Sequence, residues 1–137
     1  MARQSGVLNG TAQIAELAML AKHRETGMRA ALVRLEQALQ DARSHESDSR
    51  RAVQTRREIW LAALARGGLH DQRGLAGFCQ SVELERQALD EAVSAQSDAL
   101  GRLTQAETDV RRQRERLLAN TRRQEKLREL LVSPLCA

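Results

Sequence analysis

The chain is poor in the residues that build a broad hydrophobic core. Its 137 residues include one tryptophan, one phenylalanine, no tyrosine and one proline. Aromatic side chains supply much of the buried area of globular cores, and a helix interior tolerates proline least. What remains is rich in alanine, leucine, arginine, glutamate and glutamine, which are strong helix formers. The composition therefore predicts long helices in one domain.

The sequence also lacks the short motifs of common cofactor, phosphate and metal sites. It contains no phosphate loop, no dinucleotide-binding glycine pattern, no HExxH and no CxxC. The histidines His23, His45 and His70 are far apart, and Glu46 and Asp48 do not converge with His45 on one helical face. We therefore expect no catalytic residue, no cofactor and no metal.

What is present is a heptad repeat of apolar residues through the second half of the chain. The ladder comprises Leu75, Val82, Leu89, Gln96, Leu103, Val110, Leu117, Gln124 and Leu131. A strict heptad drifts off the face of a straight helix, so this stripe indicates a left-handed supercoil with another long helix. At about 1.5 Å per residue the ladder spans roughly 85 Å, which predicts a rod.

The first half supplies a partner stripe at spacings of three and four. Its members are Ile14, Ala18, Ala21, Met28, Leu32, Leu35, Leu39, Ala42, Val53, Trp60 and Ala63, with Glu25, Glu46, Ser49 and Arg56 as polar members. Residues 67–77 hold four of the eight glycines and predict a turn. Equal arms around a short turn predict an all-α fold, a long antiparallel two-helix coiled-coil hairpin that forms one domain over residues 1–137.

Local signals set the expected boundaries. The first helix is predicted at about 10–66, the turn at about 67–77 and the second helix at about 78–132. Asn9 or Thr11 can cap the first helix, and Pro134 ends the second. Gly27 and Gly101 interrupt the helices at roughly 1 kcal/mol each relative to alanine, either as softer points or as positions that a coiled coil tolerates.

A turn centred near residue 70 also predicts which residues face one another. Facing residues then have numbers that add up to about 140. The pairs expected from this register are Arg56 with Glu85, Glu25 with Arg114, and Leu39 with Leu100 and Leu103. Opposite charges at breaks in the stripes select the register, whereas the apolar seam supplies most of the stability.

The turn end holds both aromatic residues, Trp60 and Phe78. Together with Leu64, Leu69 and Leu75 they are expected to form an apolar cluster. The cluster closes the hairpin or, where it is exposed, offers a docking patch.

The remaining absences concern membranes and disulfides. No apolar run approaches the roughly 18 residues that a spanning helix requires, and the amino terminus lacks a basic segment followed by an apolar one. Cys79 and Cys136 are expected near opposite ends of the hairpin, too far apart for a disulfide within one chain. These features predict a cytoplasmic protein without membrane insertion.

Positive charge gathers in the last third of the chain, although the net charge is only +4. The cations complement the dipole at the helix end and are partly neutralised by neighbouring glutamates, or they form a docking surface for an anionic partner. The candidate contacts, which fall outside the apolar ladder, are Arg112, Arg116, Arg122, Arg123 and Lys126.

The chain resembles the stalk proteins of bacterial type III export, the flagellar FliJ and injectisome YscO (SctO) group. The likeness rests on a hairpin of this length and on the segment RRQEKLREL at residues 122–130. Flagellar members carry tyrosines in the mid-helix region, and their absence here favours an injectisome member.

This resemblance implies a non-enzymatic subunit similar in shape to the central stalk of rotary F-type ATPases. The paired termini, with the five basic candidates, would enter the pore of a hexameric secretion ATPase. The turn end, with Trp60, Leu64, Leu69 and Phe78, would face the export gate at the inner membrane. The group is also implicated in handling export chaperones, and its members are cytoplasmic and peripheral to the secretion apparatus.

Two other classes stay open. A nucleic-acid-binding protein would lay its arginines along phosphates, although glutamates interleave with them and no aromatic residue is available there for base stacking. A generic structural coiled coil would pair as a parallel dimer and separate Arg56 from Glu85.

Overall fold

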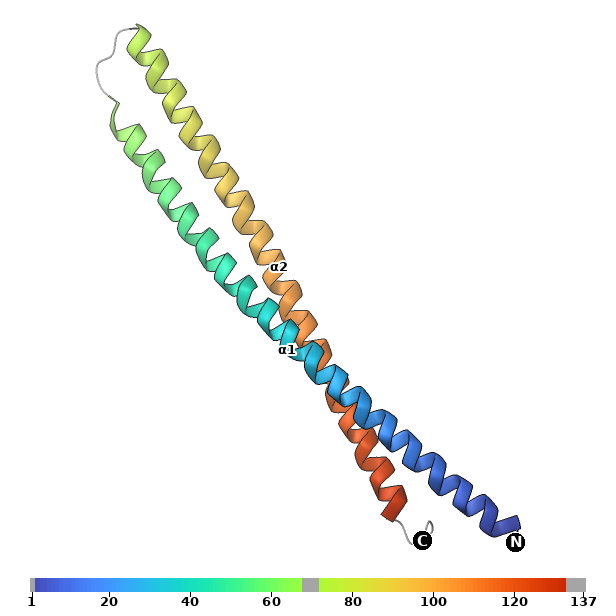
Figure 1. The fold of residues 1–137 in the computed structure, drawn as a ribbon. Coiled ribbons are helices and arrows are strands. Elements are labelled where there is room, and N and C mark those ends of the chain that lie inside the picture. The colour runs from blue at the N-terminus through green and yellow to red at the C-terminus, as the bar shows by residue number, and fades with distance from the viewer. Residues whose placement is uncertain (1, 68–71, 133–137) are drawn as a thin grey trace. The chain divides into compact units, whose positions relative to one another are not determined.

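The computed structural model describes the backbone of residues 2–67 and 72–132 and the side chains of residues 9–67 and 73–132. Helix α1 covers Ala2–Ala65 and helix α2 covers Gln72–Val132 (Figure 1). The two helices pack against each other, and the described residues contain no strand. The predicted all-α helical hairpin is confirmed. Leu69, His70, Pro134 and Cys136 lie outside the described residues.

Both helices begin earlier than expected. α1 begins at Ala2 rather than near residue 10, so Asn9 and Thr11 lie inside it and the predicted cap is wrong. α2 begins at Gln72 rather than near residue 78, which shortens the predicted turn. Glycine weakens a helix by only about 1 kcal/mol per residue and proline is absent from both segments, so the helices continue through Gly74 and Gly77. No described glycine has a positive φ.

The hairpin consists of two compact units, each with one segment of both helices. Unit 1 combines Met1–Gln37 with Thr108–Ala137 and therefore holds both chain termini. Unit 2 is the continuous stretch Ala38–Glu107 and contains the connection between the helices. In Figure 1 the helical segments of unit 2 run from cyan to green and from yellow-green to orange.

Within unit 2 the predicted stripes form the seam. Leu39, Val53 and Ala63 of α1 are buried, and the polar members Glu46 and Ser49 are buried with them. This outcome confirms Glu46 and Ser49 as members of the series, whereas the third polar member in this unit, Arg56, is exposed.

The ladder of α2 is half-buried or buried from Val82 to Leu131, but its first member is misplaced. Leu75 is 52% exposed, because α1 has already ended at Ala65 and offers no helix beside it. Leu100, expected beside Leu39, is 45% exposed, and the inward position belongs to its neighbour Ala99. A step of three back from Leu103 reaches residue 100 and a step of four reaches residue 99, and the seam follows the step of four.

A second stripe on α2, missed in the sequence, lines the seam beside the predicted ladder. Its members are half-buried or buried: Phe78, Glu85, Ala92, Ala99, Ala106, Gln113, Asn120 and Leu127. In unit 2 it consists largely of alanines, whereas in unit 1 it carries two amides. The two units therefore join their helices by different chemistry.

Candidate docking surfaces

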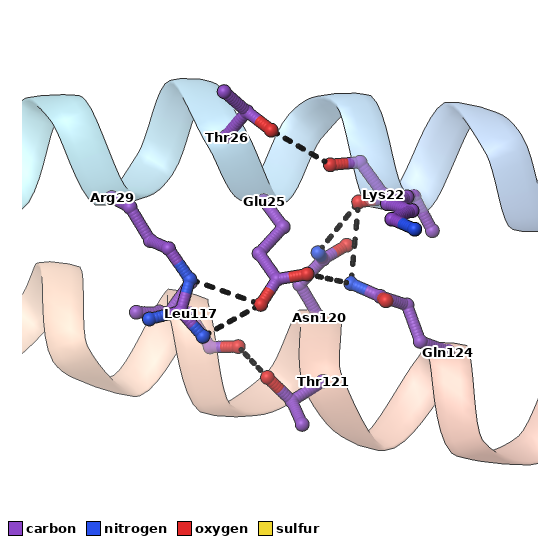
Figure 2. A network of polar contacts seen from close by, with 9 residues as sticks. Lys22, Glu25, Thr26, Arg29, Leu117, Asn120, Thr121 and Gln124 are labelled. Atoms are coloured by element: carbon purple, nitrogen blue, oxygen red, sulfur yellow. Dashed lines mark hydrogen bonds and ion pairs between the residues drawn. The ribbon is translucent and has the colours of Figure 1, made fainter.

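The seam of unit 1 contains a network of amide hydrogen bonds between the helices (Figure 2). Asn120 Nδ2 donates to the backbone carbonyl of Ala21 at 2.8 Å, and Gln124 Nε2 approaches the same oxygen at 3.5 Å. One heptad further along α1, Gln113 Nε2 donates to the carbonyl of Met28 at 3.0 Å. Asn120 and Gln113 are buried, so these bonds satisfy groups that water cannot reach.

Glu25 sits at the centre of this network. Its Oε2 accepts a hydrogen bond from Gln124 at 3.0 Å, and its Oε1 accepts two from the guanidinium of Arg29 at 3.0 and 2.7 Å (Figure 2). These bonds, first that from Gln124 and then that from Arg29, lower the pKa of the Glu25 carboxyl, while desolvation opposes them. The carboxylate is therefore held ionised inside a seam position.

The expected pairing of Glu25 with Arg114 is wrong. Arg114 pairs instead with Glu36, at 3.6 Å between Nη2 and Oε1. Glu25 occupies a seam position and turns toward Gln124, whereas Arg114 follows the seam residue Gln113 and lies on the flank, where Glu36 also lies. The register itself is close to the prediction, because the numbers of Asn120 and Ala21 add up to one more than expected.

Unit 2 confirms one predicted charge pair. Arg56 Nη1 lies 3.8 Å from Glu85 Oε2, as the antiparallel register requires and as a parallel dimer would not allow. Glu46, 4% exposed, is satisfied along its own helix by Arg50, whose Nη2 lies 2.8 Å from both carboxylate oxygens. The buried carboxylate of Glu46 is thus paired within α1 rather than across the seam.

The predicted apolar cluster at the turn end divides into two groups. Trp60 and Phe78 are half-buried, and a Cβ added at Gly67 would lie 3.3 Å from Phe78 Cζ, so the ring packs against that backbone. Leu64 and Leu75 are 42% and 52% exposed. Phe78 thus packs at the closure of the hairpin, Trp60 is half-buried and the two leucines are exposed, so a docking role for the aromatic residues stays a prediction. Further exposed apolar side chains of unit 2 near the connection are Ile59, Leu61 and Leu84.

The five basic candidates of α2 are all exposed. Across the described part of the chain, none of their side chains forms an ion pair or hydrogen bond. Arg122, Arg123 and Lys126 line a shallow hollow together with Glu125 and Glu129. The prediction that these cations lie outside the seam is confirmed, while their partner stays a prediction.

Sequence reasoning missed an apolar surface in unit 1. Large exposed side chains occur near the carboxyl-terminal end of α2 and on the segment of α1 that precedes Ala21: Leu17, Met19, Leu20, Leu130 and Val132. They lie on both sides of the seam stripe, and Met19 and Val132 are each 74% exposed. The nearly charge-free run from Thr11 to Ala21 was the available signal, because a helix that is apolar all round is usually covered by a partner.

No helix in residues 2–67 or 72–132 is long and apolar enough to cross a bilayer. Within the same ranges, no three His, Cys, Asp or Glu residues gather closely enough to hold a metal ion. Comparison with protein family models, with characterised proteins and with solved structures found no match.

Proposed function

We propose that this protein is a non-enzymatic stalk of a bacterial type III secretion system, of the YscO/SctO type and related to flagellar FliJ. The observation that carries the proposal is the set of five exposed, unpaired cations on α2 of unit 1, the unit that holds both termini. Unpaired charge beside exposed apolar side chains is typical of a surface that docks another protein. A helical hairpin supports the proposal because the resemblance requires this fold.

In this proposal each unit has one role. The open end of unit 1 enters the hexameric secretion ATPase, with the basic residues as contacts to acidic side chains of the ring. The turn end of unit 2 contacts the export gate through the exposed Leu64, and the half-buried Trp60 and Phe78 close the hairpin or join this contact. Export chaperones are further partners that the resemblance implies, and the protein acts in the cytoplasm beside the inner membrane.

The decisive experiment reverses charge on α2 of unit 1. We expect that replacing Arg112, Arg116, Arg122 and Arg123 together with glutamate leaves helicity intact, because each exposed charge contributes about 0 to 1 kcal/mol. The variant is expected to lose binding to the purified secretion ATPase of the same organism, measured by pull-down and by stimulation of ATP hydrolysis at moderate salt.

A charge-matched control separates a specific surface from general attraction. It reverses four exposed arginines of unit 2, namely Arg43, Arg57, Arg66 and Arg102. The control is expected to bind the ATPase like the original protein. A folded quadruple variant of unit 1 that still binds and stimulates the ATPase would remove the residue-level support for a stalk.

Nucleic acid is the competing partner for the same cations. Binding of duplex DNA at physiological salt, with an affinity that falls steeply as salt rises and is lost in the unit 1 variant, would favour that class instead.

A further inference from the structure

Gly27 is a helix-interior glycine that the packing of the chain does not explain. It is exposed, and a Cβ built there would meet no atom within 4 Å. A glycine inside an exposed helix is destabilising by about 1 kcal/mol relative to alanine. Gly101 in unit 2 is equally open, so open space alone points to no partner; what distinguishes Gly27 is the charged flank on which it lies.

The flank on which Gly27 lies follows from the seam. On each helix, a residue that comes directly after a seam residue lies on one flank of the seam, and a residue that comes directly before one lies on the opposite flank. Glu36 comes after Leu35 and Arg114 comes after Gln113, and the two form an ion pair, so the first flank of α1 lies beside the first flank of α2. The opposite flanks of the two helices therefore also lie side by side, and Gly27, which comes before Met28, belongs to that opposite flank.

The two flanks of unit 1 differ in the balance of their charges. The flank of residues that follow the seam carries the ion pairs of Arg114 with Glu36 and of Arg29 with Glu25, together with three exposed cations that form no ion pair among the described residues: Lys22, Arg111 and Arg128. The opposite flank, here named the cationic flank, carries six exposed cations without a partner among the described residues: Arg24, Arg34, Arg112, Arg116, Arg123 and Lys126. The acid on this flank is Asp109, at the border with unit 2, and it is already engaged.

Small residues lie among these cations. Gly27 and Ala31 on α1 and Ala119 on α2 occupy the same flank, and all three precede seam residues. Small side chains on two adjacent helices allow a third helix to approach closely. The arginines on the same flank have long side chains, whose aliphatic stems can cover apolar groups while the charged ends meet carboxylates.

We propose that the cationic flank of unit 1 docks an amphipathic α-helix of a partner protein, with an apolar stripe over Gly27 and Ala119 and glutamate or aspartate on both sides. Docking completes a local three-helix bundle. Phosphate polymers and lipid headgroups would use the cations but have no need for a glycine at the centre of the surface. The inference concerns the chemistry of the partner, so its test does not require the ATPase of the proposed function.

The experiment uses the full chain and a synthetic probe. The probe is a fluorescent four-heptad peptide with leucine at its two stripe positions and glutamate on both sides, and its binding is followed by anisotropy. The first variant is Gly27→Leu, which fills open space and raises helix propensity. We expect its thermal stability to be unchanged or higher while peptide affinity falls about tenfold, because the added side chain holds the peptide off the surface. Gly101→Leu, another open helix glycine but in unit 2, is the control and is expected to bind like the original protein.

A charge series tests the two-helix nature of the surface. Reversal of Arg24, Arg116 and Arg123 to glutamate takes one cation from α1 and two from α2, and is expected to reduce affinity by about a hundredfold through reversed complementarity. The matched control reverses three cations that follow seam residues, namely Lys22, Arg111 and Arg128, and is expected to reduce affinity less than about threefold.

Three results would overturn the proposal. In the first, Gly27→Leu binds the peptide like the original protein. In the second, the control triple variant weakens binding as strongly as the flank variant, which would indicate diffuse attraction. In the third, a scrambled peptide of equal composition, duplex DNA or anionic phosphatidylglycerol vesicles bind as tightly as the probe, which would make the flank a general polyanion surface.

Discussion

The two units differ in the residues that the second stripe of α2 brings to the seam. In unit 2 the second stripe of α2 is small and apolar, with Ala92, Ala99 and Ala106, and Ala99 is 1% exposed. In unit 1 the same stripe carries Gln113 and Asn120, which bond to backbone carbonyls of α1. Alanine seams allow close approach but distinguish poorly between registers, whereas buried amides select a register because an unbonded one is destabilising by about 1 to 3 kcal/mol. The second stripe of α2 therefore contributes close packing in unit 2 and polar specificity in unit 1.

The largest expected effect concerns packing in unit 2. Trp60→Ala should lower the free energy of unfolding by about 2 to 3 kcal/mol, since the indole is half-buried at the closing end of the seam. The measurement is chemical denaturation followed by circular dichroism. Trp60→Phe is the informative control. Trp60 Nε1 is buried and has no hydrogen-bond partner among the described residues, so removing this N–H offsets part of the stability lost with the buried area of the indole. Unchanged stability of Trp60→Ala would assign the indole to a partner surface instead.

The next effect concerns polarity in unit 1. Asn120→Leu replaces a buried amide at the seam by an apolar group, and is expected to raise the free energy of unfolding by about 1 kcal/mol while loosening the register. Asn120→Ala loses the hydrogen bond without gaining buried area, and is expected to lower it by about 1 kcal/mol. Paramagnetic relaxation from a spin label near Ala21 reports the register. A single sharp register in Asn120→Leu would show that the amide does not select it.

The smallest effect is the pH dependence of unit 1. The folded pKa of Glu25 lies below its ordinary value of 4.5, because Gln124 and Arg29 bond to the carboxylate. The sign follows from linkage: this stabilisation is fully present above about pH 4.5 and is lost as the pH falls through the lowered folded pKa. Thermal unfolding of the original protein and of Glu25→Gln between pH 3 and pH 7 should show curves that converge at the acid end. If the stabilities of the two proteins changed in parallel with pH, Glu25 would not contribute to the pH dependence of stability.

The sequence predicted the repeating parts of this molecule better than the exceptional ones. The apolar ladder, the polar seam members Glu46 and Ser49, and the pairing of Arg56 with Glu85 all follow from period and antiparallel register. The alanine and amide stripe escaped notice because small and polar residues give no hydrophobic signal at the same spacing. The helix starts were misjudged because glycine clusters weaken a helix without ending it.

The candidate surfaces divide in the same way. Exposure of the basic arm was predictable, since its members lie off the ladder. The partner of Glu25 was not predictable, because Arg29, four residues along the same helix, and Gln124 across the seam both outcompete Arg114. Gly27 was visible in the sequence, but its role required knowing that no described side chain fills the space beside it and which cations share its flank.

The carbonyl bonds of unit 1 also determine how this part of the molecule responds to a pull along α2. Backbone carbonyls of α1 accept these hydrogen bonds across the seam one heptad apart, at Ala21 and at Met28. A partial slide would leave Asn120 and Gln113 between two acceptors, and the next matching position lies about 10 Å away. At that position the hydrogen bond from Gln124 to Glu25 would be broken. Axial force on unit 1 therefore meets a stepped resistance with stops one heptad apart, and small displacements of α2 return to the starting position.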